Sequence, residues 1–142
     1  MRYFTNEGFL DLPDNWHDRS VNVLLPTIPD VPGCNLVLTR DDLPYGAEFS
    51  DYINVQKAKF KRELIDLQMH VDQSCEVDGR VAHYLEFNWQ NDRMRVYQLA
   101  LIVLDAPAVL TFTYTSPGQL PAHIRDAVGH AVINFRFRQK DD

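Results

Sequence analysis

The clearest pattern in the chain is the alternation of apolar and polar residues in four successive segments. These segments are residues 69–77, 80–89, 94–104 and 108–114, and turn-type sequences join them: Asp78-Gly79, Asn91-Asp92 and Asp105-Ala106-Pro107. Connections of two to four residues join antiparallel neighbours, so the pattern predicts a four-stranded meander. In the third segment both sets of alternate residues become apolar toward its end, which is typical of a central strand covered on both faces.

Shorter apolar segments precede the meander. Residues 2–5 and 8–12 surround the turn-like sequence Asn6-Glu7-Gly8 and predict a hairpin or a bent edge strand. Residues 20–25 alternate and predict another strand, as do residues 36–40 after a proline-rich loop. The sequence therefore predicts an antiparallel sheet of six or seven strands.

Two segments have the period of a helix instead. In residues 50–68 one stripe carries Ile53, Gln56, Phe60, Leu64 and Leu67, with the charges elsewhere, and residues 121–135 show a second apolar stripe. The tail, residues 136–142, is polar and is expected to fray. The predicted fold class is α+β, an antiparallel β-sheet meander with flanking helices, formed by residues 1–142 as a single domain.

Composition and charge narrow the possible functions. The chain is 45% hydrophobic and 24% charged, an ordinary mixture for a globular domain. Its net charge of −6 offers no basic field for phosphate backbones or anionic lipids, so nucleic acid is not an expected partner. The N-terminus has no apolar stretch of signal-peptide length, and no segment approaches a membrane span, which favours a cytoplasmic location without stable membrane insertion.

A search for catalytic and metal-binding patterns gives no candidate. Cys34 and Cys75 lack CxxC spacing, and the five histidines form neither an HxH nor an HExxH motif, so no metal site is expected. No nucleophile elbow, phosphate-binding loop or dinucleotide fingerprint is present. The sequence thus predicts a protein that is not an enzyme and needs no cofactor.

One string near the N-terminus carries a resemblance. Leu12-Pro13-Asp14-Asn15-Trp16-His17-Asp18-Arg19-Ser20-Val21-Asn22 joins a strand end, a tryptophan and an alternating strand in one fixed order. It resembles the start of DcrB-like (DUF1795) proteins, and within that group the Eag chaperones that accompany type VI secretion effectors. The likeness continues through Leu43-Pro44-Tyr45-Gly46 and the Gln56-bearing helix to Ile133-Asn134-Phe135-Arg136-Phe137.

The resemblance implies a Mog1p/PsbP-like fold and a homodimer. It also implies a chaperone or adaptor function, in which the protein shields the hydrophobic N-terminal transmembrane segments of an effector, typically of the Rhs or PAAR type, before export. Physically, such a segment exposes about 20 apolar residues, which aggregate unless a protein surface replaces the bilayer. A concave sheet with an adjoining apolar helix could supply that surface.

The candidate effector-binding groove combines apolar residues of the strands and first helix with two amides: Val21, Val23, Leu38, Gln56, Phe60, Leu64 and Gln98. Gln56 and Gln98 interrupt apolar stripes, where an unpaired amide costs about 1–3 kcal/mol, and a bound membrane helix could satisfy them through exposed backbone carbonyls. Alternatively, the apolar residues are core and the two glutamines bond to neighbouring backbone. The alternative function is that of a scaffold module that binds a folded partner. A third possible function is that of an enzyme for a small ligand, with an active site that leaves no recognisable motif in the sequence.

Overall fold

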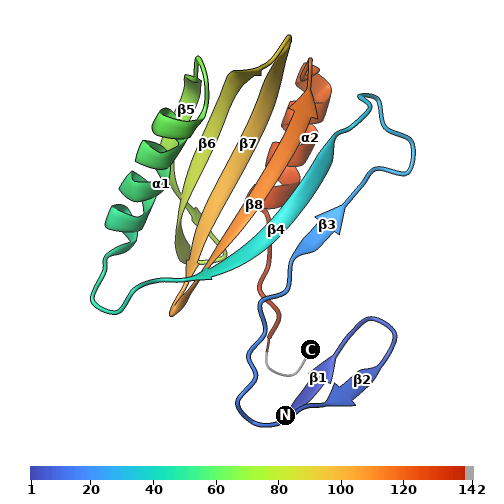
Figure 1. Cartoon of the computed structure of the whole chain (residues 1–142), viewed down its shortest axis with the longest axis vertical. Helices are drawn as coiled ribbons and strands as arrows, with labels where there is room; N and C mark the ends of the chain where they lie inside the picture. Colours follow the sequence, from blue (N-terminus) through green and yellow to red (C-terminus); the bar gives the residue numbers. More distant parts are fainter. Residues whose placement is uncertain (140–142) are drawn as a thin grey trace.

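The main body of the protein is a six-stranded antiparallel sheet (Figure 1). The structure is a computed structural model that describes residues 1–139. The strand order is β3-β4-β8-β7-β6-β5, where the strands are β3 (Asn22–Leu24), β4 (Asn35–Asp42), β5 (Gln68–Val77), β6 (Arg80–Asn91), β7 (Met94–Asp105) and β8 (Ala108–Pro117). The predicted meander is confirmed as β5 to β8, and β4 extends the sheet by pairing with β8 along its whole length.

The turns of the meander have the chemistry that their sequences predict. Asp78 and Gly79 both have positive φ, 48° and 79°, as a two-residue type I′ hairpin turn requires. Asp92, in the next turn, also has a positive φ of 53°. Asp and Gly are the residues that tolerate this conformation best, and they therefore fix the register of both hairpins.

The first residues form a separate hairpin of β1 (Arg2–Phe4) and β2 (Phe9–Asp11), which stands away from the main sheet (Figure 1). The rings of Phe4 and Phe9 lie 5.8 Å apart, and Arg2 pairs with Asp11 at 2.9 Å. Of the two arrangements that the sequence left open for this segment, the structure has the hairpin.

The two helices, α1 (Phe49–Glu63) and α2 (Ala122–Ile133), pack on opposite faces of the sheet (Figure 1). α1 ends at Glu63 rather than near residue 68, because Leu64 is extended and Asp66 takes a positive φ of 53°. Arg95 of β7 holds this turn, donating to the Asp66 carboxylate at 2.7 Å and to the Asp66 carbonyl at 2.9 Å. A tertiary contact therefore sets the end of the helix.

Each helix closes its own apolar cluster. Under α1 the buried residues are Ile53, Leu85, Phe87, Ala100, Ile102 and Val109. Under α2 they are Cys34, Val77, Ala82, Leu99, Leu101, Val103, Leu110, Phe112, Tyr114 and Val132. β7 contributes to both clusters, which confirms the prediction of a central strand covered on both faces.

Part of the tail is anchored, contrary to the expectation that it frays. The Phe137 backbone N–H donates to Asp78 at 2.9 Å, Arg136 donates to the same carboxylate at 3.2 Å, and the Arg80 guanidinium lies 3.5 Å from the Phe137 ring centre. The Phe137 N–H, followed by Arg136, lowers the pKa of Asp78 below its usual value. The remainder of the tail, residues 140–142, lies outside the described residues.

Candidate functional site

The sheet surface on the α1 side is only partly covered, because α1 lies toward the β5 edge and buries residues of β6 and β7 and, on β8, Val109 (Figure 1). One row of cross-strand partners shows where α1 stops covering the sheet. The row begins at Ala100 of β7, which is buried under α1. It continues through Thr113 of β8 and Val37 of β4 to Val23 of β3. Cross-strand partners share a face, so these side chains point to the same side. Val23, at the far end of the row, is 58% exposed.

We call this uncovered surface the open face. It comprises Val23, Val37, Gln98, Thr111, Thr113 and Thr115, which the strand register places on one side. All except Val23 are half-buried. None of the six carries a charge, and five of them are β-branched. These six residues therefore form a neutral surface with hydroxyl and amide groups set among methyl groups, and the charged Asp41, on the same side of β4, borders it where it accepts a hydrogen bond from Tyr52 of α1.

Of the residues predicted for a groove, Val23 and Gln98 lie on the open face. Val21 is exposed and comes just before β3 in the chain, where the pairing of β3 with β4 begins only at Asn22. Leu38 was predicted for the same groove as Val23, but the structure places it on the opposite face, where it pairs with Phe112 and packs on the α2 cluster. Because successive residues of a strand point to opposite faces, Val37 takes the place on the open face.

Phe60 and Leu64 are parts of the core under α1. The Phe60 ring stacks on that of Phe87 with ring centres 5.1 Å apart, and Leu64 packs on the same cluster. Both side chains are half-buried. The alternative interpretation of these two residues, as core rather than groove, is the one that the packing supports.

Gln98 is bonded within the chain. Its Oε1 accepts from Trp89 Nε1 at 2.7 Å, and its Nε2 donates to Thr115 Oγ1 at 3.0 Å. The side-chain amide therefore already has partners, and they are side chains rather than the backbone groups that the sequence suggested. These bonds join β6, β7 and β8 at one end of the open face.

Gln56 lies on the side of α1 that borders the open face. Tyr52, one turn earlier on the same side, donates to Asp41 of β4 at 3.1 Å, and burial followed by the Asp41 charge raises the pKa of Tyr52 to about 12. Lys57, the next residue in the chain, instead pairs with Asp72 of β5 at 2.7 Å. Gln56 is half-buried, and within residues 1–139 its amide makes no hydrogen bond.

The sequence reasoning missed the row of threonines. Thr111, Thr113 and Thr115 alternate with buried Leu110, Phe112 and Tyr114, so the signal was a strand with one apolar face and one hydroxyl-bearing face. Val37 was missed because the segment containing it gives no hint of which face meets α2.

Other chemistry-bearing groups lie away from the open face. Asp72 joins α1 to the sheet through Lys57 and a short contact to His83, and these two partners, Lys57 first, lower the Asp72 pKa. Cys34 and Cys75 are free thiols. In the part of the chain that the structure describes, no group of three or more His, Cys, Asp or Glu side chains is placed to hold a metal ion, and no helix is long and apolar enough to cross a membrane.

The fold and this surface define a small α+β domain whose sheet is left open on one side. The chain belongs to the DcrB family, whose model matches residues 7–134. Over 123 residues it is 29% identical to the protein named Effector EagT6 of Pseudomonas aeruginosa, and the match covers 85% of each chain.

Solved structures agree with this assignment. The crystal structure of PA94 from Pseudomonas aeruginosa, a protein of unknown function, superposes with a TM-score of 0.80 at 26% identity, covering 99% of this chain and 98% of that one. LpqN of Mycobacterium tuberculosis, involved in cell envelope biogenesis, superposes with a TM-score of 0.51 at 14% identity over 84% and 83% of the two chains, which shows the fold alone. The expected α+β fold of the Mog1p/PsbP-like type is confirmed.

Proposed function

We propose that this protein is a chaperone or adaptor of a type VI secretion effector, and that its open face binds an N-terminal transmembrane segment of an Rhs- or PAAR-type effector before export. The similarity to Effector EagT6 supports the association with an effector. The observation that carries the choice of surface is that the open face is uncovered, neutral and rich in β-branched residues. The proposed role is non-enzymatic and is exercised in the cytoplasm.

The dimensions of the open face fit one helix. From β7 to β3 there are three strand spacings, or about 14 Å at ~4.8 Å each, against a helix diameter of about 10–12 Å. The ten residues of β8 extend about 34 Å, and a helix of about 20 residues is about 30 Å long. One transmembrane helix could therefore lie along the surface and exchange its water for protein contacts.

The polar groups of the open face suit such a segment. A charged side chain against an apolar helix would lose hydration without compensation, whereas a threonine hydroxyl or a glutamine amide can meet an exposed backbone carbonyl of a helix rich in small residues. Gln56 has a free amide at the border of this surface, so it is the glutamine that we assign to contact with the bound segment. Gln98 instead stiffens the surface through its internal bonds.

We further propose that the protein works as a homodimer, on the family resemblance. Two copies would present two open faces to an effector that carries more than one apolar segment. Light scattering of the purified chain tests this part on its own: a monomer mass at working concentration would remove the dimer and leave the single-copy proposal standing.

The test of the binding proposal is co-expression with the first ~60 residues of a candidate effector encoded beside this gene, a length that can hold a membrane span of about 20 residues. Wild type is compared with Val23→Asp on the open face and with Val81→Asp. Val81 is a matched control, because it is a strand valine with 57% exposure at the far side of α1. Thermal melts of both variants serve as the control that each one folds.

We expect capture of the segment by wild type and by Val81→Asp, with capture lost in Val23→Asp and reduced in Gln56→Ala. Equal capture by both aspartate variants would show that the segment binds elsewhere. Failure of the folded wild type to keep the segment soluble would overturn the proposal.

A further inference from the structure

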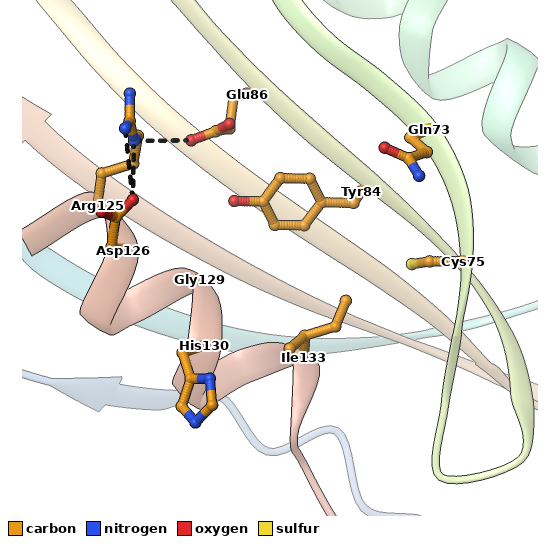
Figure 2. Close-up of a pocket in the computed structure, with 9 residues that line it drawn as sticks. All are labelled: Gln73, Cys75, Tyr84, Glu86, Arg125, Asp126, Gly129, His130 and Ile133. Carbon is orange, nitrogen blue, oxygen red and sulfur yellow. Dashed lines mark hydrogen bonds and ion pairs between the residues drawn. The ribbon is translucent and has the colours of Figure 1, made fainter. Parts of the chain in front are cut away.

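A pocket lies on the side of the sheet opposite the open face, between α2 and the strands β5 and β6 (Figure 2). Its volume is about 460 Å³. α2 approaches the sheet closely here: a Cβ on Gly129 would lie 3.1 Å from the Tyr84 hydroxyl oxygen. The lining is rich in side chains with polar heads: Gln73, Cys75, Tyr84, Glu86, Arg125, Asp126 and His130, together with Gly129 and Ile133.

Glu86 is the residue that makes this pocket unusual. Its side chain is only 18% exposed, and its Oε1 is fully buried without a hydrogen-bond donor anywhere in residues 1–139. The nearest cation is Arg125, whose Nε lies 3.9 Å from that oxygen, too far for a hydrogen bond. Arg125 also points at Asp126, 3.3 Å away, so its guanidinium is shared (Figure 2).

The neighbours of Glu86 do not supply the missing donor. Burial, then the Glu86 charge and the approach of the Glu86 side chain to the hydroxyl raise the pKa of Tyr84, but the contact does not meet hydrogen-bond geometry at the buried Oε1. The pocket lining carries two carboxylates, Glu86 and Asp126, against the single guanidinium of Arg125. Such a lining favours a positively charged occupant over an anionic one.

A second, smaller hollow of about 330 Å³ shares Glu86 and Arg125 with the first. Glu86 therefore stands in the wall between two spaces, and Arg125 lies at the edge of both. The Tyr84 ring and Ile133 add apolar surface to the larger space. A charged head at Glu86 and an aliphatic stem along Tyr84 and Ile133 would both be accommodated there.

We propose that this pocket binds an organic cation with N–H donors, an alkylammonium or guanidinium head on an aliphatic stem, with Glu86 as the acceptor. The group comes either from a lysine or arginine side chain of a partner protein or from a free amine. This site is on the other face of the sheet from the open face and does not depend on the effector-binding proposal. The cation would pair with the carboxylate of Glu86, whose side chain lines the pocket and whose Oε1 has no hydrogen-bond donor within residues 1–139.

The experiment is an NMR titration of the full chain with n-butylammonium chloride, following the backbone amide of Gly129 at the pocket wall. Sodium butyrate and n-butylurea are the matched probes, because they keep the stem and change the head to an anion or a neutral amide. Nα-acetyl-lysine N-methylamide, a lysine with blocked ends, tells a protein side chain from a free amine by whether its blocked backbone is tolerated.

We expect saturable shifts with butylammonium, weaker ones with butylurea and none with butyrate. Glu86→Gln, which keeps the shape of the side chain, should weaken butylammonium binding by about tenfold or more, since a hydrogen bond to a charged group is lost. Glu76→Gln, an exposed carboxylate on β5 outside the pocket, should leave binding unchanged.

Equal shifts with all three heads, or no saturation with butylammonium, would overturn the proposal. So would undiminished binding by Glu86→Gln. If Glu86→Gln melts too early to be titrated, the comparison of the three heads on the wild type still decides the question. Binding of the blocked lysine would assign the pocket to a protein side chain, and its exclusion while butylammonium binds would assign it to a free amine.

Discussion

Replacing Phe60 by alanine should destabilise the fold rather than act on effector binding alone. Phe60 holds α1 to the sheet by stacking on Phe87 at 5.1 Å and by packing on the cluster under α1. Phenylalanine-to-alanine changes in full cores cost about 3–5 kcal/mol, and because Phe60 is only half-buried we expect a smaller cost, about 2–3 kcal/mol. For a chain of this size that corresponds to a fall in melting temperature of roughly 10 °C.

The assay is thermal and urea unfolding, followed by far-ultraviolet circular dichroism. Val55→Ala is the control on the same helix, because Val55 is exposed and alanine favours the helical backbone; its stability should stay within about 0.5 kcal/mol of wild type. If Phe60→Ala unfolds at the same temperature as Val55→Ala, the packing described for α1 is wrong, and Phe60 becomes available again as a residue of the binding surface.

Three further predictions concern single contacts. Gln98→Leu leaves the Trp89 indole N–H without its acceptor and should lower the free energy of unfolding by about 1–3 kcal/mol in urea titrations; an unchanged midpoint would show that the bond contributes nothing. The lowered pKa of Asp72 means that its carboxylate stabilises the fold above the ordinary value of 3.8 and that this stability is lost as the pH falls through the folded pKa. Asp72→Asn should therefore melt earlier than wild type near neutral pH, with the difference closing in acid; a constant difference would count against the ion pair. Gly129→Ala should fail to deliver the roughly 1 kcal/mol that alanine normally adds to a helix, because the new methyl group meets the Tyr84 hydroxyl at 3.1 Å, and a full gain in a thermal melt would contradict this geometry.

The family resemblance was readable because it rests on residues close together in the sequence. The string from Leu12 to Asn22 predicted a family that the match over residues 7–134 confirms. The sequence predicted the candidate site less accurately than the family, because the site depends on contacts between distant segments. Val23 and Leu38, predicted for one groove, lie on opposite faces of the sheet, and the unpaired amide expected of Gln98 is bonded to Trp89 and Thr115.

The sequence by itself determined the local elements of this protein. The positive φ of Asp78 and Gly79 follows from residue chemistry, and the two apolar faces of β7 follow from its composition, so the meander could be derived without any structure. These features depend on neighbours two to four residues apart, and such interactions are encoded within the segment itself.

Only the tertiary structure decided which way the remaining strands face and where α1 ends. The alternation in β4 reads equally well in either orientation, and pairing with β8 is what turns Leu38 toward α2 and Val37 toward the open face. The end of α1 depends likewise on Arg95, which is far along the chain from Asp66. A period of two cannot tell one face of a sheet from the other, so the partner strand must make that choice.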